Sequence, residues 1–318
     1  MKIIEFMKLY PNEESCKSAW KRHRDKVGVV CPICGSILHY WKQDKECYEC
    51  KTCRYRQSLR ANTVMHGSHL PFYYWFMAMF MLATTKKSFS AMELQRQVGH
   101  KHYAPIWALL HKLRLSMGQS EVLHELDGIV ELDEGYFSTE VPEGQKDEPL
   151  KRGRGSQRKT KVLVMAETKF PSVEEVVKAR KRGQCKPTKV GRIKMIIIDN
   201  LKADTIDPIA SQSISPESTV VTDDSSSYTN FHKMFKVHQS QVVPKEQIGK
   251  VLPWVHIAIS NAKRTILDIF HDVKPEYLQS YLNEFCYKFN RRYFRETLFE
   301  NMLTTAIKYK NYFRYNIA

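Results

Sequence analysis

The stretch that decides how this chain is interpreted is Val130-Glu131-Leu132-Asp133-Glu134-Gly135-Tyr136-Phe137. Apolar and polar residues alternate along it, as in a half-buried β-strand, and the alternation carries two acids into a turn that contains glycine. A carboxylate at the end of a strand can hold a divalent cation, although an Asp in this position more often forms only a turn. Taken alone, the stretch leaves a turn and a metal site as alternatives.

A second strand ending on paired acids strengthens the metal interpretation. It is Ser218-Thr219-Val220-Val221-Thr222-Asp223-Asp224, a short β-branched stretch that again closes on two carboxylates. Two such strand ends, far apart in a basic chain, predict metal-assisted phosphoryl chemistry on a nucleic acid.

The charge of the chain is strongly basic and unevenly distributed. The 318 residues carry 50 Lys and Arg against 34 Asp and Glu, and the formal net charge of +16 favours a polyanion as partner. Residues 151–194 contain 15 basic residues and 3 acids, so they supply +12 of this charge. A solvated loop can have the same composition. Contact with nucleic acid is favoured because the segment lies between the two acid-bearing strands.

Five of the eight cysteines lie between Cys31 and Cys53. Cys31-Pro32-Ile33-Cys34 and Cys50-Lys51-Thr52-Cys53 are two CxxC pairs separated by 15 residues, a spacing typical of a zinc ribbon with four thiolate ligands. Cys47 is an alternative ligand. A closed site of four cysteines leaves no open position for a substrate, so the expected Zn²⁺ is structural.

The expected compartment is a reducing cytosol. Met1–Tyr10 lacks the long apolar core of a secretory signal, and cysteines clustered in CxxC pairs favour metal over disulfides. The most apolar run, Leu70–Ala83, contains Pro71 and is too short for a bilayer, which needs about 20 residues. No membrane partner is expected.

The segment between the cysteines and the first acid is predicted to be helical. Phe72–Leu82 is apolar almost all round, as in a core helix. A serine of Ser88-Phe89-Ser90 is expected to cap a helix that ends at Gly99, and Tyr103–Leu115 gives a second helix with His111, Lys112 and Arg114 on its polar side. Helix, glycine turn and basic helix form a helix-turn-helix pattern, which many helical hairpins that bind no DNA also share.

Beyond Leu126 the pattern changes to short strands. We expect four strands and one helix, followed by a long helix at Lys274–Arg292 whose aromatic face packs into a core. The strands are Gly128–Leu132, Lys161–Glu167, Ile193–Ile198 and Thr219–Thr222, and the helix is Ala203–Ala210. This order predicts a mixed α/β sheet with its acids at one edge. Asp199 is a further possible ligand, although it suits a turn or cap better.

The order of these parts resembles bacterial insertion-sequence transposases of the IS1595 group, which have an ISXO-type catalytic domain. The resemblance covers about residues 10–300. It rests on the cysteine pairs, Glu-Leu-Asp-Glu, Lys-Arg-Gly-Arg-Gly-Ser, Val-Thr-Asp-Asp and the motif Tyr-Leu-Gln-Ser-Tyr-Leu-Asn-Glu-Phe-Cys-Tyr-Lys-Phe-Asn-Arg-Arg-Tyr-Phe. It implies a ribonuclease H-like α/β domain in which three ligands hold two Mg²⁺ or Mn²⁺ ions. The implied activity is to cut transposon ends and join them to target DNA, in a bacterial cytoplasm and in association with the nucleoid.

The resemblance also implies roles for single residues. Asp133 matches the first catalytic acid and Asp223 the second. Asn261, within Ser260–Arg264, matches an amide form of the third ligand, and Lys263 is the accompanying cation that offsets charge on the scissile phosphate. His256 is an alternative third ligand. An amide oxygen adds no negative charge, so Asn261 would hold the second metal more weakly.

The expected organisation has four parts. They are a zinc ribbon with a short helical start (1–60), a helical, helix-turn-helix-like segment (61–120), the catalytic domain (121–300) and a C-terminal tail (301–318). The first two would bind the terminal inverted repeats of double-stranded DNA, on which the protein would act as a homo-oligomer. Expected DNA contacts are Arg54, Arg56, Lys112, Arg114, Lys151, Arg152, Arg154, Arg264, Arg291 and Arg292. Two rival hypotheses are a silent DNA-binding protein derived from a transposase, and a nuclease that cuts without joining.

Overall fold

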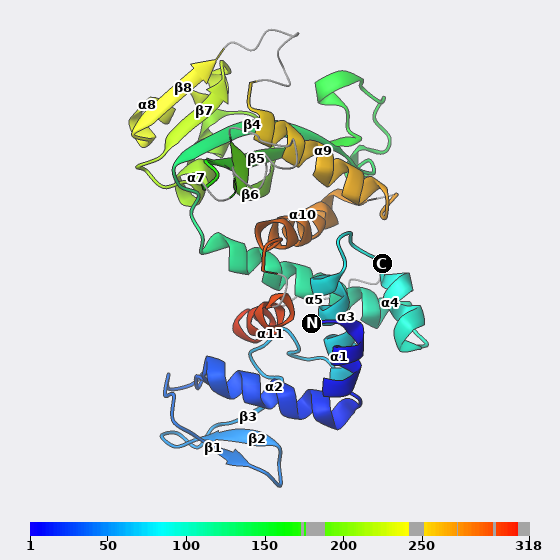
Figure 1. Cartoon of the computed structure of the whole chain (residues 1–318). Coiled ribbons are helices and arrows are strands. Elements are labelled where there is room, and N and C mark those ends of the chain that lie inside the picture. The colour runs from blue at the N-terminus through cyan, green and yellow to red at the C-terminus, as the bar shows by residue number, and fades with distance from the viewer. Residues whose placement is uncertain (173–174, 176–187, 242–250, 272, 295–296, 311–318) are drawn as a thin grey trace. The chain divides into compact units, whose positions relative to one another are not determined.

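The computed structural model describes residues 1–172, 175, 188–241, 251–271, 273–294 and 297–310. The chain divides into two compact units, labelled along the ribbon in Figure 1. Unit 1 consists of Met1–Ser120 and Arg291–Ala318, and unit 2 of Glu121–Asn290. In the described part of the chain, no helix combines the length and apolarity needed to cross a bilayer.

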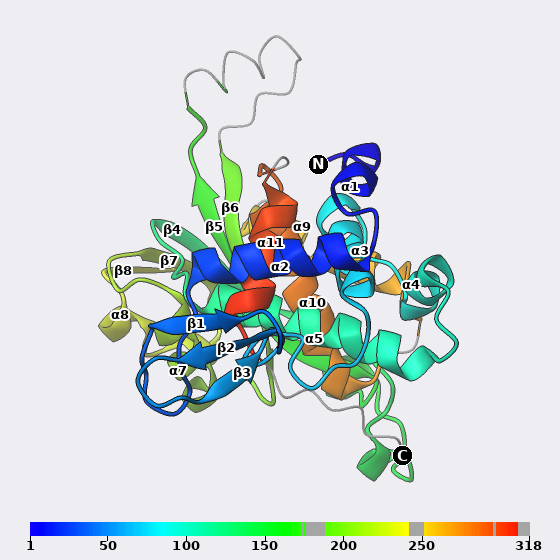
Figure 2. The ribbon, with the colours of Figure 1, turned by 90° about the horizontal axis from the view of Figure 1, so that it is seen from below.

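Unit 2 contains a five-stranded mixed sheet in the order β6-β5-β4-β7-β8. The strands are β4 (Ile129–Ser138), β5 (Lys159–Lys169), β6 (Lys189–Ile198), β7 (Thr219–Asp223) and β8 (Val237–Gln241). β4, β5 and β6 run antiparallel, and β5 and β6 lie side by side as a long pair in Figure 2. β4, β7 and β8 are parallel. The predicted mixed α/β sheet is therefore confirmed.

Helices cover both faces of this sheet. One face packs against α7 (Ala203–Ser213), and the core there includes buried Leu132, Leu163 and Val220. The other face packs against α9 (Pro253–Leu267) and α10 (Pro275–Asn290), around buried Val162, Val164 and Phe137. Alternating residues of β4 and β5 thus enter two different cores, as the period of two in their sequences requires.

β4 continues beyond the point at which its sequence suggests a turn. The prediction that Asp133 ends the strand is wrong, because pairing with β5 extends through Ser138, which lies opposite Lys159. Gly135 lies within the strand and allows α9 to approach, since a Cβ built there would lie 3.3 Å from Cγ1 of Ile259. The glycine therefore serves packing between strand and helix.

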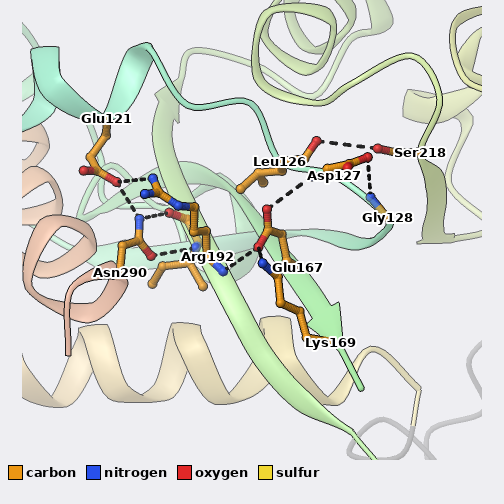
Figure 3. A network of polar contacts seen from close by, with 10 residues as sticks. Glu121, Leu126, Asp127, Gly128, Glu167, Lys169, Arg192, Ser218 and Asn290 are labelled. Carbon is orange, nitrogen blue, oxygen red and sulfur yellow. Dashed lines mark hydrogen bonds and ion pairs between the residues drawn. The ribbon is translucent and has the colours of Figure 1, made fainter. Parts of the chain in front are cut away.

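The edge of the sheet at β6 is closed by side-chain amides from α10. Asn290 accepts from the backbone N–H of Ile193 (2.8 Å) and donates to the carbonyl of the same residue (3.0 Å) and to Glu121 (2.6 Å) (Figure 3). Gln279 likewise accepts from Ile197 N–H (2.9 Å) and donates to the Met195 carbonyl (3.0 Å). These amides replace a neighbouring strand and protect the backbone of the edge.

Glu167 joins the beginnings of two strands in the same network (Figure 3). Its buried carboxylate accepts from the backbone N–H groups of Asp127 (3.2 Å) and Arg192 (2.9 Å), and it pairs with Lys169 (3.2 Å). It lies where the register of β5 with β6 shifts, over Gly191, at which a Cβ would come within 2.8 Å of the Cβ of Glu167. The glycine at this position leaves room for the buried acid.

Unit 1 contains a small sheet and a group of helices. The sheet has the order β1-β2-β3, and α2 packs against it through Arg24, which donates to the carbonyls of Ser58 (2.9 Å) and Ala61 (2.7 Å). The strands are β1 (His39–Lys42), β2 (Cys47–Cys50) and β3 (Arg56–Ser58). The helices are α1 (Ile3–Leu9), α2 (Glu13–Val27), α3 (Phe72–Thr84), α4 (Ala91–Val98), α5 (Tyr103–Val122) and α11 (Leu298–Lys308).

α11 belongs to the core of unit 1. Phe299 is buried and its ring packs against those of Phe6 and Phe76, while the carbonyl of Ala306 accepts from Val64 N–H (2.9 Å). Residues 301–308 of the segment treated as a tail are thus helical.

The predicted helix pair in unit 1 is present, with one correction. The serine that caps α4 is Ser90, whose hydroxyl accepts from Glu93 N–H (3.1 Å), and the helix ends as expected at Gly99 in the left-handed conformation. The expected polar side of α5 is wrong, because His111 and Arg114 are 0% and 1% exposed. Every residue of α5 from Ala104 to Gly118 is buried or half-buried, and a local helical pattern does not show how many neighbours a helix has.

Candidate functional site

Asp133 and Asp223 follow the paired part of two adjacent parallel strands at equal distances. The ladder between β4 and β7 runs from Ile129–Thr219 to Glu131–Val221, and each aspartate comes two residues after this last pair. Neighbouring strands are about 4.8 Å apart. Residues ninety positions apart in the sequence are therefore brought together by the sheet.

Both acids are on the face covered by α9. Val130 and Val220 are buried in the opposite core, with α7, and side chains alternate along a strand. Glu131, Asp133, Gly135 and Phe137 therefore follow one another on the α9 side of β4, and Asp223 is on the same side of β7. One oxygen of Asp133 accepts from Glu134 N–H (2.8 Å), which fixes the orientation of its carboxylate.

Glu134 points to the other face, where buried Tyr228 donates a hydrogen bond to its carboxylate. Burial, together with the negative charges of Glu134, Asp133 and Asp223, raises the pKa of Tyr228 far above its ordinary value. The charges of both aspartates therefore reach this phenol. Asp133 and Asp223 offer the hard oxygen donors that fit a divalent cation such as Mg²⁺.

α9 runs alongside β4 and presents the other predicted site residues. His256 Nδ1 lies 3.7 Å from an Asp133 carboxylate oxygen, and burial lowers the pKa of this histidine, although the charge of Glu131 opposes the shift. Lys263 Nζ lies 5.7 Å from the centre of the Phe137 ring, and burial followed by the charge of Lys159 lowers its pKa.

Asn261 is exposed on the same helix. It comes five residues after His256, which at 3.6 residues per turn directs the two side chains to different sides of α9. The contacts place His256, not Asn261, directly beside Asp133. Within the described residues, the four cysteines below are the only group of three or more His, Cys, Asp and Glu with ligand atoms within 4.8 Å of one another.

The four cysteines Cys31, Cys34, Cys50 and Cys53 converge in unit 1. Two sulfur pairs are 3.5 Å apart, Cys31 with Cys53 and Cys34 with Cys50. Cys47 is buried on β2 and does not belong to the group. Four converging thiols are the donor set of a structural Zn²⁺ site, so the cluster is compatible with the predicted zinc ribbon.

The two cysteine pairs form matching turns. Gly35 donates to the Cys31 carbonyl (3.0 Å) and Arg54 to the Cys50 carbonyl (3.1 Å), and both residues are left-handed, with φ of 71° and 62°. Backbone N–H groups of Cys53 and Thr52 help to lower the pKa of the Cys50 thiol to about 6. The turn therefore favours the thiolate at Cys50, the form of cysteine that binds a metal, whereas the neighbouring sulfurs raise the pKa of Cys34 and Cys53.

The predicted DNA contacts differ in exposure and in their partners. Lys151, Arg152 and Arg264 are exposed in unit 2, whereas the side chain of Arg154 lies outside the described part of the structure. Arg54 and Arg56 on the ribbon share Glu49 as an ion-pair partner, at 3.8 Å and 2.6 Å. Lys112 and Arg292 are half-buried; Lys112 donates to the His66 carbonyl (2.9 Å), and Arg292 stacks on Tyr293.

Two of the predicted DNA contacts are buried. Arg114 is 1% exposed in α5, and Arg291 is 8% exposed and donates to Ser120 Oγ (3.1 Å). The expectation that Arg291 is an exposed helix end is therefore wrong. A guanidinium with internal partners has a structural role in the unit that contains it.

Sequence analysis gave no role to Glu131, which the structure makes prominent. Its carboxylate is 5% exposed and accepts from Trp254 N–H (2.7 Å), Val255 N–H (3.1 Å) and the Thr168 hydroxyl (3.0 Å). The available signal was its position two residues before Asp133, which puts both acids on one face of a strand.

Comparison with known protein families matches residues 125–290 to the ISXO2-like transposase domain of the IS1595 type. The match covers more than half of the chain and contains every residue of the acid-bearing sheet. The chain therefore belongs to the IS1595 family of transposases. Membership of this family indicates an enzyme that processes DNA. A search of curated proteins finds no match to the chain.

Proposed function

We propose that the protein is a DNA transposase that cuts the ends of its element and joins them to target DNA. The observation that supports this proposal is that Asp133 and Asp223 each come two residues after the last pair of two parallel strands, on the face that α9 covers. A five-stranded mixed sheet with helices on both faces supports a ribonuclease H-like assignment for unit 2.

Asp133 and Asp223 would hold the catalytic metal ions, with Asn261 as the proposed third ligand and His256 as its alternative. Two carboxylates with a neutral donor suit Mg²⁺ or Mn²⁺, which prefer oxygen ligands. Bound ions of this kind activate water or a 3′-hydroxyl as nucleophile and stabilise the leaving oxygen in an in-line displacement.

The other residues would bind and orient the DNA. Lys263, half-buried beside Phe137, can offset negative charge near the scissile phosphate. Exposed Lys151, Arg152 and Arg264 would contact the phosphate backbone, so affinity should fall steeply with salt. The ribbon, with its proposed structural Zn²⁺, and the α4–α5 pair would bind the terminal repeats, and a homo-oligomer would bring two ends together.

The test is Mg²⁺-dependent cutting and joining of labelled element ends by wild type, Asp133→Asn, Asp223→Asn and Asn261→Ala, with DNA binding measured in parallel. We expect cutting to fall by more than about a hundredfold in both Asp variants while binding persists. A wild type that binds but never cuts with any divalent metal would contradict the proposal. Nicks without joined products would instead indicate a nuclease. If Asn261→Ala retains activity, His256→Ala identifies the third ligand.

A further inference from the structure

The helix that carries His256, Asn261 and Lys263 begins without a cap of its own. Leu252 occupies the N-cap position of α9 with a φ of 55° and makes no side-chain capping bond, and Pro253 is the first helical residue. The first N–H groups of a helix need acceptors from outside the helix. Pro253 has no N–H group and therefore needs no acceptor. The next two, from Trp254 and Val255, both donate to one oxygen of Glu131, at 2.7 Å and 3.1 Å.

The other oxygen of Glu131 is held from the sheet. Thr168 on β5 donates to it at 3.0 Å, so the carboxylate is fixed on two sides. Burial raises the pKa of Glu131, and the N–H donors of Val255 and Trp254 and the Thr168 hydroxyl act in the opposite direction. A carboxylate at a helix N-terminus also interacts favourably with the helix dipole.

This cap is two residues from Asp133 on the same face of β4. The first turn of α9 contains His256, whose ring nitrogen lies 3.7 Å from Asp133. Further along, Ile259 contacts Gly135 and Lys263 lies over Phe137, so helix and strand stay in register for more than two turns. The position at which α9 is fixed to β4 therefore determines which residues of the helix lie beside which residues of the strand.

We propose that Glu131 is a positioning residue that caps α9 from β4 and thereby sets the positions of His256, Asn261 and Lys263 along β4 relative to Asp133. Its role in cutting rests on the function proposed above. The cap itself does not depend on that function, so it can be tested even if the protein cuts no DNA.

The chain offers a matched control for this cap. Glu13 accepts from Phe72 N–H and Tyr73 N–H, both at 2.8 Å, at the start of α3, where Pro71 likewise makes no side-chain cap. The same chemistry thus occurs at a helix that carries none of the proposed metal ligands. Glu131→Ala and Glu13→Ala remove equivalent caps.

The first measurement is amide hydrogen exchange, followed by mass spectrometry on the full chain. Glu131→Ala should speed exchange of the Trp254 and Val255 amides by about tenfold, because an N-cap of this kind is worth about 1 kcal/mol or more. Glu131→Gln should keep most of the protection, since its amide oxygen can accept both N–H groups. Glu13→Ala should speed exchange only at the start of α3. Unchanged exchange at α9 in Glu131→Ala would overturn the inference.

The second measurement is Mn²⁺-dependent cutting. Glu131→Ala should raise the Mn²⁺ concentration for half-maximal cutting by about tenfold at unchanged DNA affinity, and Glu131→Gln should restore it. A merely structural role would instead lower the melting temperature and leave the metal requirement of the folded protein unchanged. A Gln variant with full exchange protection but no cutting would also overturn the inference, because the charge itself would then be required.

Thr168→Val keeps the test available if Glu131→Ala does not fold. It removes one donor and leaves the carboxylate in place, so it should give a smaller increase in exchange at Trp254 and Val255, and no increase would count against the cap. If wild type cuts no DNA, the proposed function fails, while the exchange results still decide whether Glu131 caps α9.

Discussion

The phenol of Tyr228 donates a hydrogen bond to Glu134, the residue that follows Asp133 on β4. Tyr228 belongs to the short turn η3 (Ser226–Tyr228) that follows Asp223. The contact therefore links the segment after one proposed metal ligand to the residue beside the other.

Removing this hydroxyl should destabilise unit 2. Tyr228→Phe is expected to lower the free energy of unfolding by about 1–2 kcal/mol, because Glu134 loses a donor in a mostly buried setting. Urea unfolding measures the change. Tyr293→Phe, at an exposed position, is the control and should be neutral. Equal stability of the two variants would show that the hydrogen bond contributes nothing.

A larger residue at Gly135 should push α9 away from the sheet. A Cβ there would lie 3.1 Å from the Phe137 ring and 3.3 Å from Ile259, so Gly135→Val is expected to cost about 1–3 kcal/mol and to impair cutting. Thermal unfolding and the cutting assay report the two effects. Gly144→Val is the control, because a Cβ at Gly144 meets nothing within 4 Å. A fully active, stable Gly135→Val variant would contradict the close packing.

Zinc content distinguishes the four clustered cysteines from Cys47. Cys34→Ser should lose the metal and destabilise the ribbon, because binding free energy at a structural site is folding free energy. Cys47→Ser should keep about one zinc per chain, since Cys47 lies outside the cluster. Metal analysis of the purified variants decides between the two. Loss of zinc in Cys47→Ser with retention in Cys34→Ser would reverse the assignment.

Asn290 should be important for stability although its sequence position suggests only a helix end. Asn290→Leu would leave the N–H and carbonyl of Ile193 without this partner, at an expected cost of about 2–3 kcal/mol. Denaturant unfolding tests this value. Asn301→Leu, at a residue whose amide meets Thr297 at 3.4 Å, serves as control and should cost less. An unchanged free energy of unfolding in Asn290→Leu would mean that water can replace the amide at the N–H and carbonyl of Ile193.

Local patterns were sufficient to predict four of the five strands of unit 2, the cysteine cluster and the placement of paired acids on two strands, whereas the polar strand β8 was missed. They failed where tertiary pairing decides. In isolation, Gly135 suggests a turn. In the structure, β4 forms ten residue pairs with β5 and continues past this glycine. The sequence pattern places Arg114 on a polar surface, but the residue is buried in the structure. The sequence of one helix does not reveal which other elements pack against it. Glu131 was visible as an acid, but its partners Trp254 and Val255 are more than 120 positions away.

The parallel pairing of β4 with β7 also has a consequence for the growing chain. Asp133 leaves the ribosome long before Asp223 and α9, and the loop between the strands must close before the acids meet. A nascent or truncated chain that ends before residue 223 would hold only one of the two acids. The proposed cutting and joining of DNA would thus remain latent during synthesis and begin only when β7 and α9 have folded onto β4.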